Sequence, residues 1–371
     1  MIIDIHCHYT LTRLAATAGE RFSFEPLPSG GPAARNQGAL PTDFDSCVAR
    51  RALHRPTWRA SRWLLRLPPP GEALDRRLQA EYERQLLAPG PIERFVLLAF
   101  DAARDDAGGC PPLPQPGDAF GSDMYTSNSL IRRLCRRHPR RFLFGASVHP
   151  YRPDAAACLE EVFVAGACLL KWLPLHQNID VTDPRTAAVL RQCAGLGLPL
   201  LVHYGAEFTL MTQRPQYRSV RPLLAVLREL RREGAMPCVI VAHAATPVLP
   251  WGDADSHRAL VAALLGEFAD APLYADVSAL TAWAKLWFLR RLLRRPELHA
   301  KLLFGSDFPV PPVPLHGRRD PAAPHEPAGR TSWPQRTAQA LRRMGLGEIA
   351  FHRAAELLPN VNYFAGSAPS A

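Results

Sequence analysis

Eight short apolar runs, separated by stretches with helical periodicity, constrain the fold of this chain more than any other feature. Each run is apolar on both faces and is followed by polar residues, glycine or proline, as in strands buried on both sides of a parallel sheet. The expected strands are Ile2–His8, Phe95–Phe100, Phe142–Val148, Ala167–Leu173, Leu198–His203, Val239–His243, Leu273–Val277 and Leu302–Asp307. The expected helices are Ser127–Arg137, Asp154–Val164, Pro184–Ala194, Val220–Arg232, His257–Phe268, Leu280–Leu293 and Gln335–Met344, with Asp154 and Asp183-Pro184 as N-terminal caps.

This alternation predicts an α/β protein with a (β/α)₈ TIM barrel. An open, doubly wound sheet is the alternative, but no GxGxxG turn follows the first expected strand. A length of 371 residues fits two average domains or one barrel with insertions. Because all eight strands belong to one alternating pattern, we expect a single domain over residues 1–371.

Three insertions account for the residues beyond a minimal barrel. They follow expected strands 1, 2 and 8 and occupy residues 9–93, Asp101–Thr126 and Pro309–Pro334. All three leave from strand C-termini, the face on which barrel enzymes build their active sites. We therefore expect residues 9–93 to form a lid-like insertion, with helix-like stretches near Ser46–Leu67 and Glu72–Leu87.

Composition limits the possible partners. The net charge of +10, with lysine at only three of 44 basic positions, raises the hypothesis of a basic nucleic-acid-binding protein. Two arginine clusters, within Arg50–Arg66 and Arg132–Arg141, have spacings that fit outer, solvated helix faces. No nucleic-acid module accompanies them, so we expect no nucleic-acid partner. We also expect no membrane-spanning segment, free thiols at the eight cysteines, a cytoplasmic location and, as an open option, a homodimer.

Polar residues end five of the expected strands. His6 and His8 alternate onto the same side of the first strand, whereas the fifth and sixth strands end in His203 and His243. Asp307 ends the eighth strand and Lys171 lies at the end of the fourth. Since the C-terminal ends of barrel strands surround one cavity, these six side chains are expected to meet. Imidazoles with one carboxylate are typical ligands of a divalent metal such as zinc.

With these residues the sequence resembles the amidohydrolase superfamily, and within it the amidohydrolase-2 group that includes aminocarboxymuconate-semialdehyde decarboxylase. The resemblance runs from Met1 to about Phe364 and covers the long first insertion less well. Its most specific pieces are Asp4-Ile5-His6-Cys7-His8, Val202-His203-Tyr204-Gly205, Val241-Ala242-His243 and Leu303-Phe304-Gly305-Ser306-Asp307-Phe308-Pro309.

The resemblance implies one divalent metal, Zn²⁺, held by His6, His8, His203 and Asp307. It also implies that Asp307 takes or orients the proton of a metal-activated water, and that His243 stabilises the oxyanion or shuttles a proton. In the two-metal branch of the superfamily, a lysine at the position of Lys171 is carbamylated and bridges two metals, and His243 is then a ligand. Lys171 could instead contact substrate.

Further substrate-binding candidates lie in the loops after strands three to five. Arg152 could clamp a substrate carboxylate or form a surface salt bridge. His149 and His176 are candidates for contact with substrate or with the metal ligands. The loop residues Glu207, Arg214 and Arg218 could line the pocket, although solvated positions are the simpler expectation for them.

Two enzymatic functions fit this site. The first is a metal-dependent hydrolase that uses metal-activated water on an amide, ester or lactone in a small organic substrate, which could also carry a carboxylate. The second is a non-oxidative decarboxylase, a carboxy-lyase of an aromatic or unsaturated acid. We favour the hydrolase, and a non-catalytic nucleic-acid-binding protein remains the remote alternative.

Overall fold

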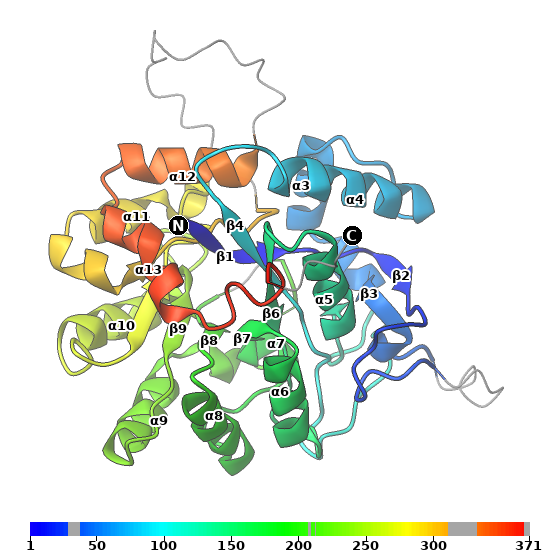
Figure 1. Ribbon diagram of the computed structural model, residues 1–371, viewed down its shortest axis with the longest axis horizontal. Coiled ribbons are helices and arrows are strands. Elements are labelled where there is room, and N and C mark those ends of the chain that lie inside the picture. The colour runs from blue at the N-terminus through cyan, green and yellow to red at the C-terminus, as the bar shows by residue number, and fades with distance from the viewer. Residues whose placement is uncertain (29–37, 207–208, 212, 311–331, 367–371) are drawn as a thin grey trace, which may run out of the picture.

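A parallel sheet of eight strands forms the centre of the computed structural model, which describes residues 1–28, 38–206, 209–211, 213–310 and 332–366 (Figure 1). The strands are hydrogen-bonded in the order β1-β4-β6-β7-β8-β9-β10-β11, and every pair is parallel. Their bounds are β1 Ile3–His8, β4 Arg94–Leu98, β6 Phe142–Ala146, β7 Ala167–Trp172, β8 Leu200–His203, β9 Val239–Ala242, β10 Leu273–Asp276 and β11 Leu302–Leu303.

Backbone hydrogen bonds join the two ends of this sheet. The amide of Ile5 donates to the carbonyl of Phe304 at 3.4 Å, Asp307 donates to His6 at 2.8 Å and His8 donates to Phe308 at 2.8 Å. The first strand thereby meets the segment that follows the last one, which closes the barrel. The expected (β/α)₈ TIM barrel and its eight strands are confirmed.

The strands divide their side chains between two apolar clusters. The inner cluster fills the barrel with residues such as Val96, Leu169 and Leu201, and the helix residues Ala354 and Leu358 pack against it. The outer cluster lies between strands and helices. It contains Trp172, whose indole donates to Val148 O at 2.7 Å, so this side chain faces away from Lys171 as its alternate position predicts. The inside of the barrel below its mouth is therefore filled by apolar side chains.

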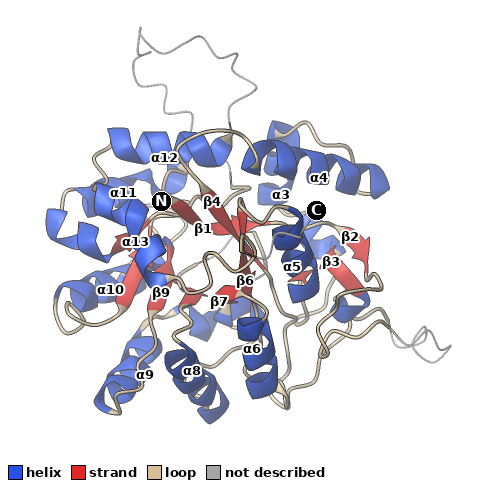
Figure 2. Cartoon of the chain, in the orientation of Figure 1, coloured by secondary structure: helices blue, strands red, loops and turns tan. Residues whose placement is uncertain are grey.

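Helices surround the strand ring (Figure 2). The barrel helices are α5 Asn128–Arg137, α6 Ala155–Val164, α7 Pro174–Gln177, α8 Pro184–Leu196, α9 Arg221–Arg232, α10 Asp255–Leu265, α11 Leu286–Leu293, α12 Trp333–Arg343 and α13 Glu348–Leu357. The 3₁₀ helices are η1 Pro41–Asp43, η2 Pro215–Arg218, η3 His243–Ala245, η4 Trp283–Lys285 and η5 Pro296–Lys301. All seven expected helices exist, although α11 begins six residues later than Leu280, and α13 was not expected.

The two aspartates expected to cap helices behave differently. The Asp183 carboxylate accepts a hydrogen bond from the Arg185 amide at 2.8 Å and caps α8, as predicted. The prediction for Asp154 is wrong in part, because this residue occupies the cap position of α6 without a side-chain cap hydrogen bond. Its carboxylate is bound instead by the guanidinium of Arg152 at 2.9 and 3.0 Å.

The first and second insertions together form a small sheet that sequence patterns did not reveal. Strands β2 Arg13–Ala15, β3 Phe44–Val48 and β5 Met124–Thr126 pair in antiparallel fashion beside the barrel. The helix expected near residues 46–67 is therefore wrong at its start, and the region continues as α2 Arg50–Leu53 and α3 Pro56–Leu64. Helix α4, Glu72–Leu86, matches the second expected helix. Most of the third insertion, residues 311–331, lies outside the described residues.

Three arginines of these clusters, Arg51, Arg133 and Arg141, bind buried carboxylates or backbone carbonyls, which corrects for them the expectation of a solvated position. The fully buried carboxylate of Asp45 is bound by Arg21 of the first insertion and by Arg133 of α5. Arg51 binds the buried Asp123, and Arg141 donates to four backbone carbonyls between residues 86 and 93. These contacts fix the insertion against the barrel.

Replacing Asp45 by alanine is expected to destabilise the protein by about 3–5 kcal/mol, because two guanidinium groups would then share a buried site without an anion. Urea unfolding followed by circular dichroism measures the change. Asp270→Ala is the matched control, since Asp270 also pairs with an arginine, Arg231, but at an exposed site. Equal losses in the two variants would show that burial of Asp45 is irrelevant to its contribution.

The remaining sequence expectations concern thiols and membranes. All eight cysteines are free, as predicted, and six of them are buried. Within the described part of the chain, no helix is both long enough and apolar enough to cross a membrane.

Candidate metal centre

A cavity of about 250 Å³ opens at the C-terminal ends of the barrel strands. Its polar wall consists of the six side chains expected to meet there: His6, His8, Lys171, His203, His243 and Asp307. The opposite wall is largely apolar and is shared between the first insertion and the barrel loops: Thr10, Thr57, Trp58, Ala60, Tyr82, Met124, Leu173, Thr209, Leu210, Pro309 and Val310. The first insertion thus provides a wall of the cavity through α3 and α4.

The buried carboxylate of Asp276 fixes the orientation of His6. Its Oδ2 lies 2.8 Å from Nδ1 of His6, and because an ionised carboxylate only accepts, Nδ1 carries the proton. The lone pair of His6 is then on Nε2, which lies 3.3 Å from Asp307 Oδ1. A carboxylate bound to the far nitrogen of an imidazole is the usual support of a metal-ligating histidine.

A similar arrangement orients His243. Its Nδ1 lies 2.9 Å from the carbonyl oxygen of Ser278, so this nitrogen is the donor and Nε2 holds the lone pair. Nε2 of His243 lies 3.8 Å from Asp307 Oδ2. The backbone amide of His243 donates to Asp276 Oδ1 at 2.7 Å, so one carboxylate positions both histidines.

Asp307 reaches the site through an unusual backbone. Its φ of +61° lies in the left-handed region, and its amide donates to the His6 carbonyl at 2.8 Å. Gly305 permits this close approach, since a Cβ at that position would lie 3.0 Å from Cβ of His6 and 3.1 Å from Cβ of Ser278. Asp307 Oδ1 lies 3.3 Å from Nε2 of His8 as well as from Nε2 of His6.

These donors fit a divalent cation. One ligand atom each from His6, His243 and Asp307 lies within 4.8 Å of the others, and all three residues are buried. His8 and His203 line the same cavity, and the His203 ring centroid lies 5.0 Å from that of His243. Two nitrogen lone pairs and a carboxylate that converge in a buried place are ligands suited to a divalent cation.

The electrostatics of the site lower the pKa of two of its histidines, His6 and His243. Burial, and next the charge of Lys171, hold the pKa of His6 well below its usual value. Burial and the charge of Lys285 do the same to the pKa of His243. Lys171 itself is buried, and its Nζ lies 3.2 Å from Nε2 of His6. Neutral imidazoles are the form that binds a metal.

The substrate-binding candidates of the middle strands lie outside the cavity wall. The guanidinium of Arg152 is bound to Asp154 and lies 3.9 Å from Asp101. Nε2 of His149 lies 2.7 Å from the Gln177 carbonyl, and burial lowers the pKa of His149 to about 4. Nδ1 of His176 lies 2.5 Å from the carbonyl of Met211.

Two of the three loop candidates after strand five, Arg214 and Arg218, do not line the metal-site cavity. Arg214 donates to Asn178 Oδ1 at 2.7 Å. Arg218 donates to the Pro215 carbonyl at 3.1 Å and lines a different cavity, whereas Glu207 lies outside the described residues.

Sequence reasoning missed the residues that support the ligands. Asp276 ends the strand β10, and the strand-end rule that selected Asp307 would have found it. Ser278 gave no such signal, although its Oγ lies 2.9 Å from His6 Nδ1 and 2.8 Å from His243 Nδ1. Trp58 lines the cavity, but it lies in a segment that the sequence predicted only as helix-like, and no signal marked it as a site residue.

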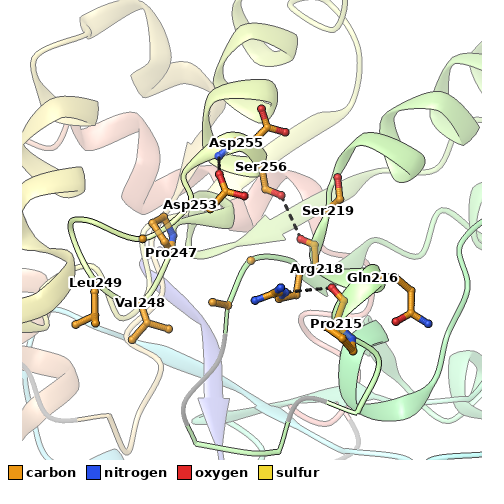
Figure 3. Close-up of a pocket in the computed structure, with 13 residues that line it drawn as sticks. Pro215, Gln216, Arg218, Ser219, Pro247, Val248, Leu249, Asp253, Asp255 and Ser256 are labelled. Atoms are coloured by element: carbon orange, nitrogen blue, oxygen red, sulfur yellow. Dashed lines mark hydrogen bonds between the residues drawn. The ribbon is translucent and has the colours of Figure 1, made fainter.

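A larger cavity of about 410 Å³ lies beside the metal-site cavity, between the loops that follow β8 and β9 (Figure 3). Several of its polar groups bind one another. Ser256 donates to the Arg218 carbonyl at 3.2 Å, and Asp253 accepts from the Asp255 amide at 2.9 Å. None of the six strand-end residues lines this cavity, so the candidate chemistry belongs to the smaller one.

A closed (β/α)₈ barrel with histidines and an aspartate converging at its mouth defines a metal-dependent barrel enzyme of the amidohydrolase type. The family model described as amidohydrolase matches residues 3–344, and this chain belongs to that family, in agreement with the expected amidohydrolase-2 membership. No curated protein matches the chain in sequence.

Solved structures with similar folds share little sequence with this chain. An uncharacterised TIM-barrel protein from Bordetella bronchiseptica is 16% identical, covers 98% of this chain and 99% of its own, and has a TM-score of 0.54. A candidate 2-pyrone-4,6-dicarboxylic acid hydrolase from Pseudomonas putida is 16% identical, with 96% and 97% covered and a TM-score of 0.48. The 5-carboxyvanillate decarboxylase from Sphingomonas paucimobilis is 13% identical, with 95% and 98% covered and a TM-score of 0.48.

Proposed function

We propose that this chain is a metal-dependent hydrolase that cleaves an amide, ester or lactone in a small, largely apolar substrate. The observation that carries the proposal is the convergence of His6, His8 and Asp307, whose Oδ1 lies 3.3 Å from Nε2 of each histidine, in a cavity whose wall includes Trp58 and Leu173. A zinc ion held by His6, His8, His203 and Asp307 would supply Lewis-acid activation of water and of the substrate carbonyl.

The protein's own groups would then move the protons. Asp307, whose carboxylate faces three histidines, is placed to accept a proton from the attacking water. His243 presents the lone pair of Nε2 to the same space while its Nδ1–H is held by the Ser278 carbonyl. It can therefore take a proton at Nε2 and deliver it to the leaving group without rotating. The apolar wall excludes bulk water from this exchange.

The second candidate is a non-oxidative decarboxylase that uses the same site. The observation that favours it is the buried Lys171, whose Nζ lies 3.2 Å from His6 Nε2 and could pair with a substrate carboxylate. Arg152, the other clamp considered, is bound to Asp154 and does not line the cavity. For this reason we rank the hydrolase first.

Metal analysis followed by a substrate screen tests the proposal. We expect about one zinc per chain, loss of activity after chelation and recovery on adding zinc. Amides, esters and lactones should release an acid, with no carbon dioxide. Carbon dioxide released from aromatic carboxylates would support the decarboxylase instead. A ratio near two metals, with the mass of a carbamate on Lys171, would replace the one-metal site by a bridged pair.

A further inference from the structure

A hollow of about 330 Å³ lies between α10 and α11. None of the six strand-end residues of the metal site lines it. Figure 1 shows both helices on the outside of the strand ring. The wall combines aromatic rings with cationic side chains: His257, Arg258, Trp287, Phe288, Arg291 and Arg295. This volume is within the range of small-molecule sites.

The positive charge of this hollow is largely uncompensated. Among the described residues, neither Arg291 nor Arg295 has a carboxylate oxygen within ion-pair distance. Arg258 lies 3.8 Å from Asp255, and that carboxylate already accepts two hydrogen bonds from Arg221, at 2.7 and 2.8 Å. Among the described residues, Asp255 is therefore the one carboxylate within ion-pair distance of these three guanidinium groups, and Arg221 already binds it.

Two arginines of the neighbouring helix α9 differ from those of the hollow in their ion pairing. On α9, Arg228 binds Glu267 through two hydrogen bonds of 2.6 and 2.8 Å. Arg231 of the same helix binds Asp270 at 2.8 Å. Arg228 and Arg231 of α9 are thus paired with protein carboxylates, whereas among the described residues Arg291 and Arg295 of the hollow are not.

The buried imidazole of His257 also lines the hollow, close enough to the three arginines for their charge to affect its pKa. Burial lowers the pKa of His257, and Arg291, Arg258 and Arg295 lower it further. The ring itself is fixed, because its Nδ1 lies 2.8 Å from the Ala244 carbonyl. A negatively charged group in this hollow would lie among the guanidinium groups of Arg258, Arg291 and Arg295, which line it.

Two aromatic rings and several aliphatic side chains complete the wall. Trp287 and Phe288 meet at 89° with centroids 4.9 Å apart, and the guanidinium of Arg291 lies over the Trp287 ring at 4.5 Å. Nearly half of the Trp287 surface is exposed, at 47%. An indole and a guanidinium held together in this way offer a flat surface for another ring beside a charge.

We propose that the hollow between α10 and α11 binds a phosphate monoester with a flat, apolar body, at a site separate from the metal centre. A phosphate monoester carries a charge of about −1.5 to −2 near neutral pH, which matches two unpaired guanidinium groups. Guanidinium forks bind phosphate oxygens through paired hydrogen bonds. The ring of the ligand packs against the exposed part of Trp287.

Isothermal titration of the full-length protein with phenyl phosphate tests this site. We expect saturable binding at one equivalent, with inorganic phosphate at least about tenfold weaker because it lacks a ring, and with no binding of phenol. The double variant Arg291→Gln/Arg295→Gln should weaken phenyl phosphate binding about 30-fold or more. Binding should quench tryptophan fluorescence, and Trp287→Phe should reduce the quenching.

The matched control is Arg290→Gln/Arg294→Gln, which removes the same charge from neighbouring positions that do not line the hollow. This control should change binding less than threefold. Equal losses in both double variants would reduce the effect to general attraction and overturn the proposal. The proposal would also be overturned if the protein bound no phenyl phosphate and sedimented as a dimer.

The metal centre is tested apart from the hollow by His6→Ala/His8→Ala, which should bind phenyl phosphate as the wild type does. Loss of binding in that variant would move the ligand to the metal-site cavity and contradict the proposed site. Arg291→Lys/Arg295→Lys keeps the charge but loses the fork, and should give an intermediate affinity.

Discussion

The double variant His6→Ala/His8→Ala is expected to retain less than about a tenth of the wild-type zinc content and to lose activity at least about 1,000-fold. His6 and His8 contribute two imidazoles that meet the same oxygen of Asp307, each at 3.3 Å. Removing both leaves that carboxylate with His243 and His203, too few ligands in place for tight binding. Elemental analysis after dialysis measures the metal directly.

A control must separate this effect from the general affinity of histidines for zinc. His54→Ala/His352→Ala removes two exposed histidines and should leave both metal content and activity unchanged. Thermal unfolding gives a readout that does not depend on knowing the substrate. Added zinc should raise the Tm of the wild type and of the control, but not of the double variant. Zinc bound at one equivalent by the double variant would contradict the ligand assignment.

Strand ends were the part of the site that sequence could predict. The alternation of buried strands places His6, Lys171, His203 and Asp307 at the barrel mouth independently of the loop conformations. The reason is that all eight strands are parallel, so their C-terminal ends lie at the same end of the barrel. The pattern also separated inward from outward positions, as Trp172 shows. Such predictions depend on backbone periodicity alone, which a single sequence carries.

The remainder depends on contacts between segments distant in sequence. The helix-like region near residues 46–67 begins as β3 because it pairs with β2 and β5, neither of which has a strong pattern of its own. Arg152 had the chemistry of a carboxylate clamp, yet a neighbouring aspartate two residues away binds it first. Local chemistry predicts what a side chain can bind, whereas its neighbours in space decide what it does bind.

Asp276→Asn is expected to weaken zinc binding about 10- to 100-fold, although Asp276 itself does not line the cavity. The carboxylate accepts from Nδ1–H of His6 at 2.8 Å and from the His243 amide at 2.7 Å. An amide in its place either turns an NH₂ group toward Nδ1 of His6 or loses the contact to His243. In the first case His6 must shift its proton to Nε2 and can no longer offer that atom to a metal.

Asp4→Asn is the control that makes this a test of positioning. The Asp4 carboxylate is equally buried, with its pKa raised by burial to about 6, but it accepts from the backbone amides of Ser306 and His6 at 2.9 and 3.2 Å and not from an imidazole. Both variants should lose stability, whereas only Asp276→Asn should change zinc affinity by tenfold or more. Nitrogen NMR of labelled histidine should show the altered proton position on His6 in the metal-free protein. If both variants weaken zinc binding equally, Asp276 stabilises the fold of the barrel mouth and does not act through the tautomer of His6.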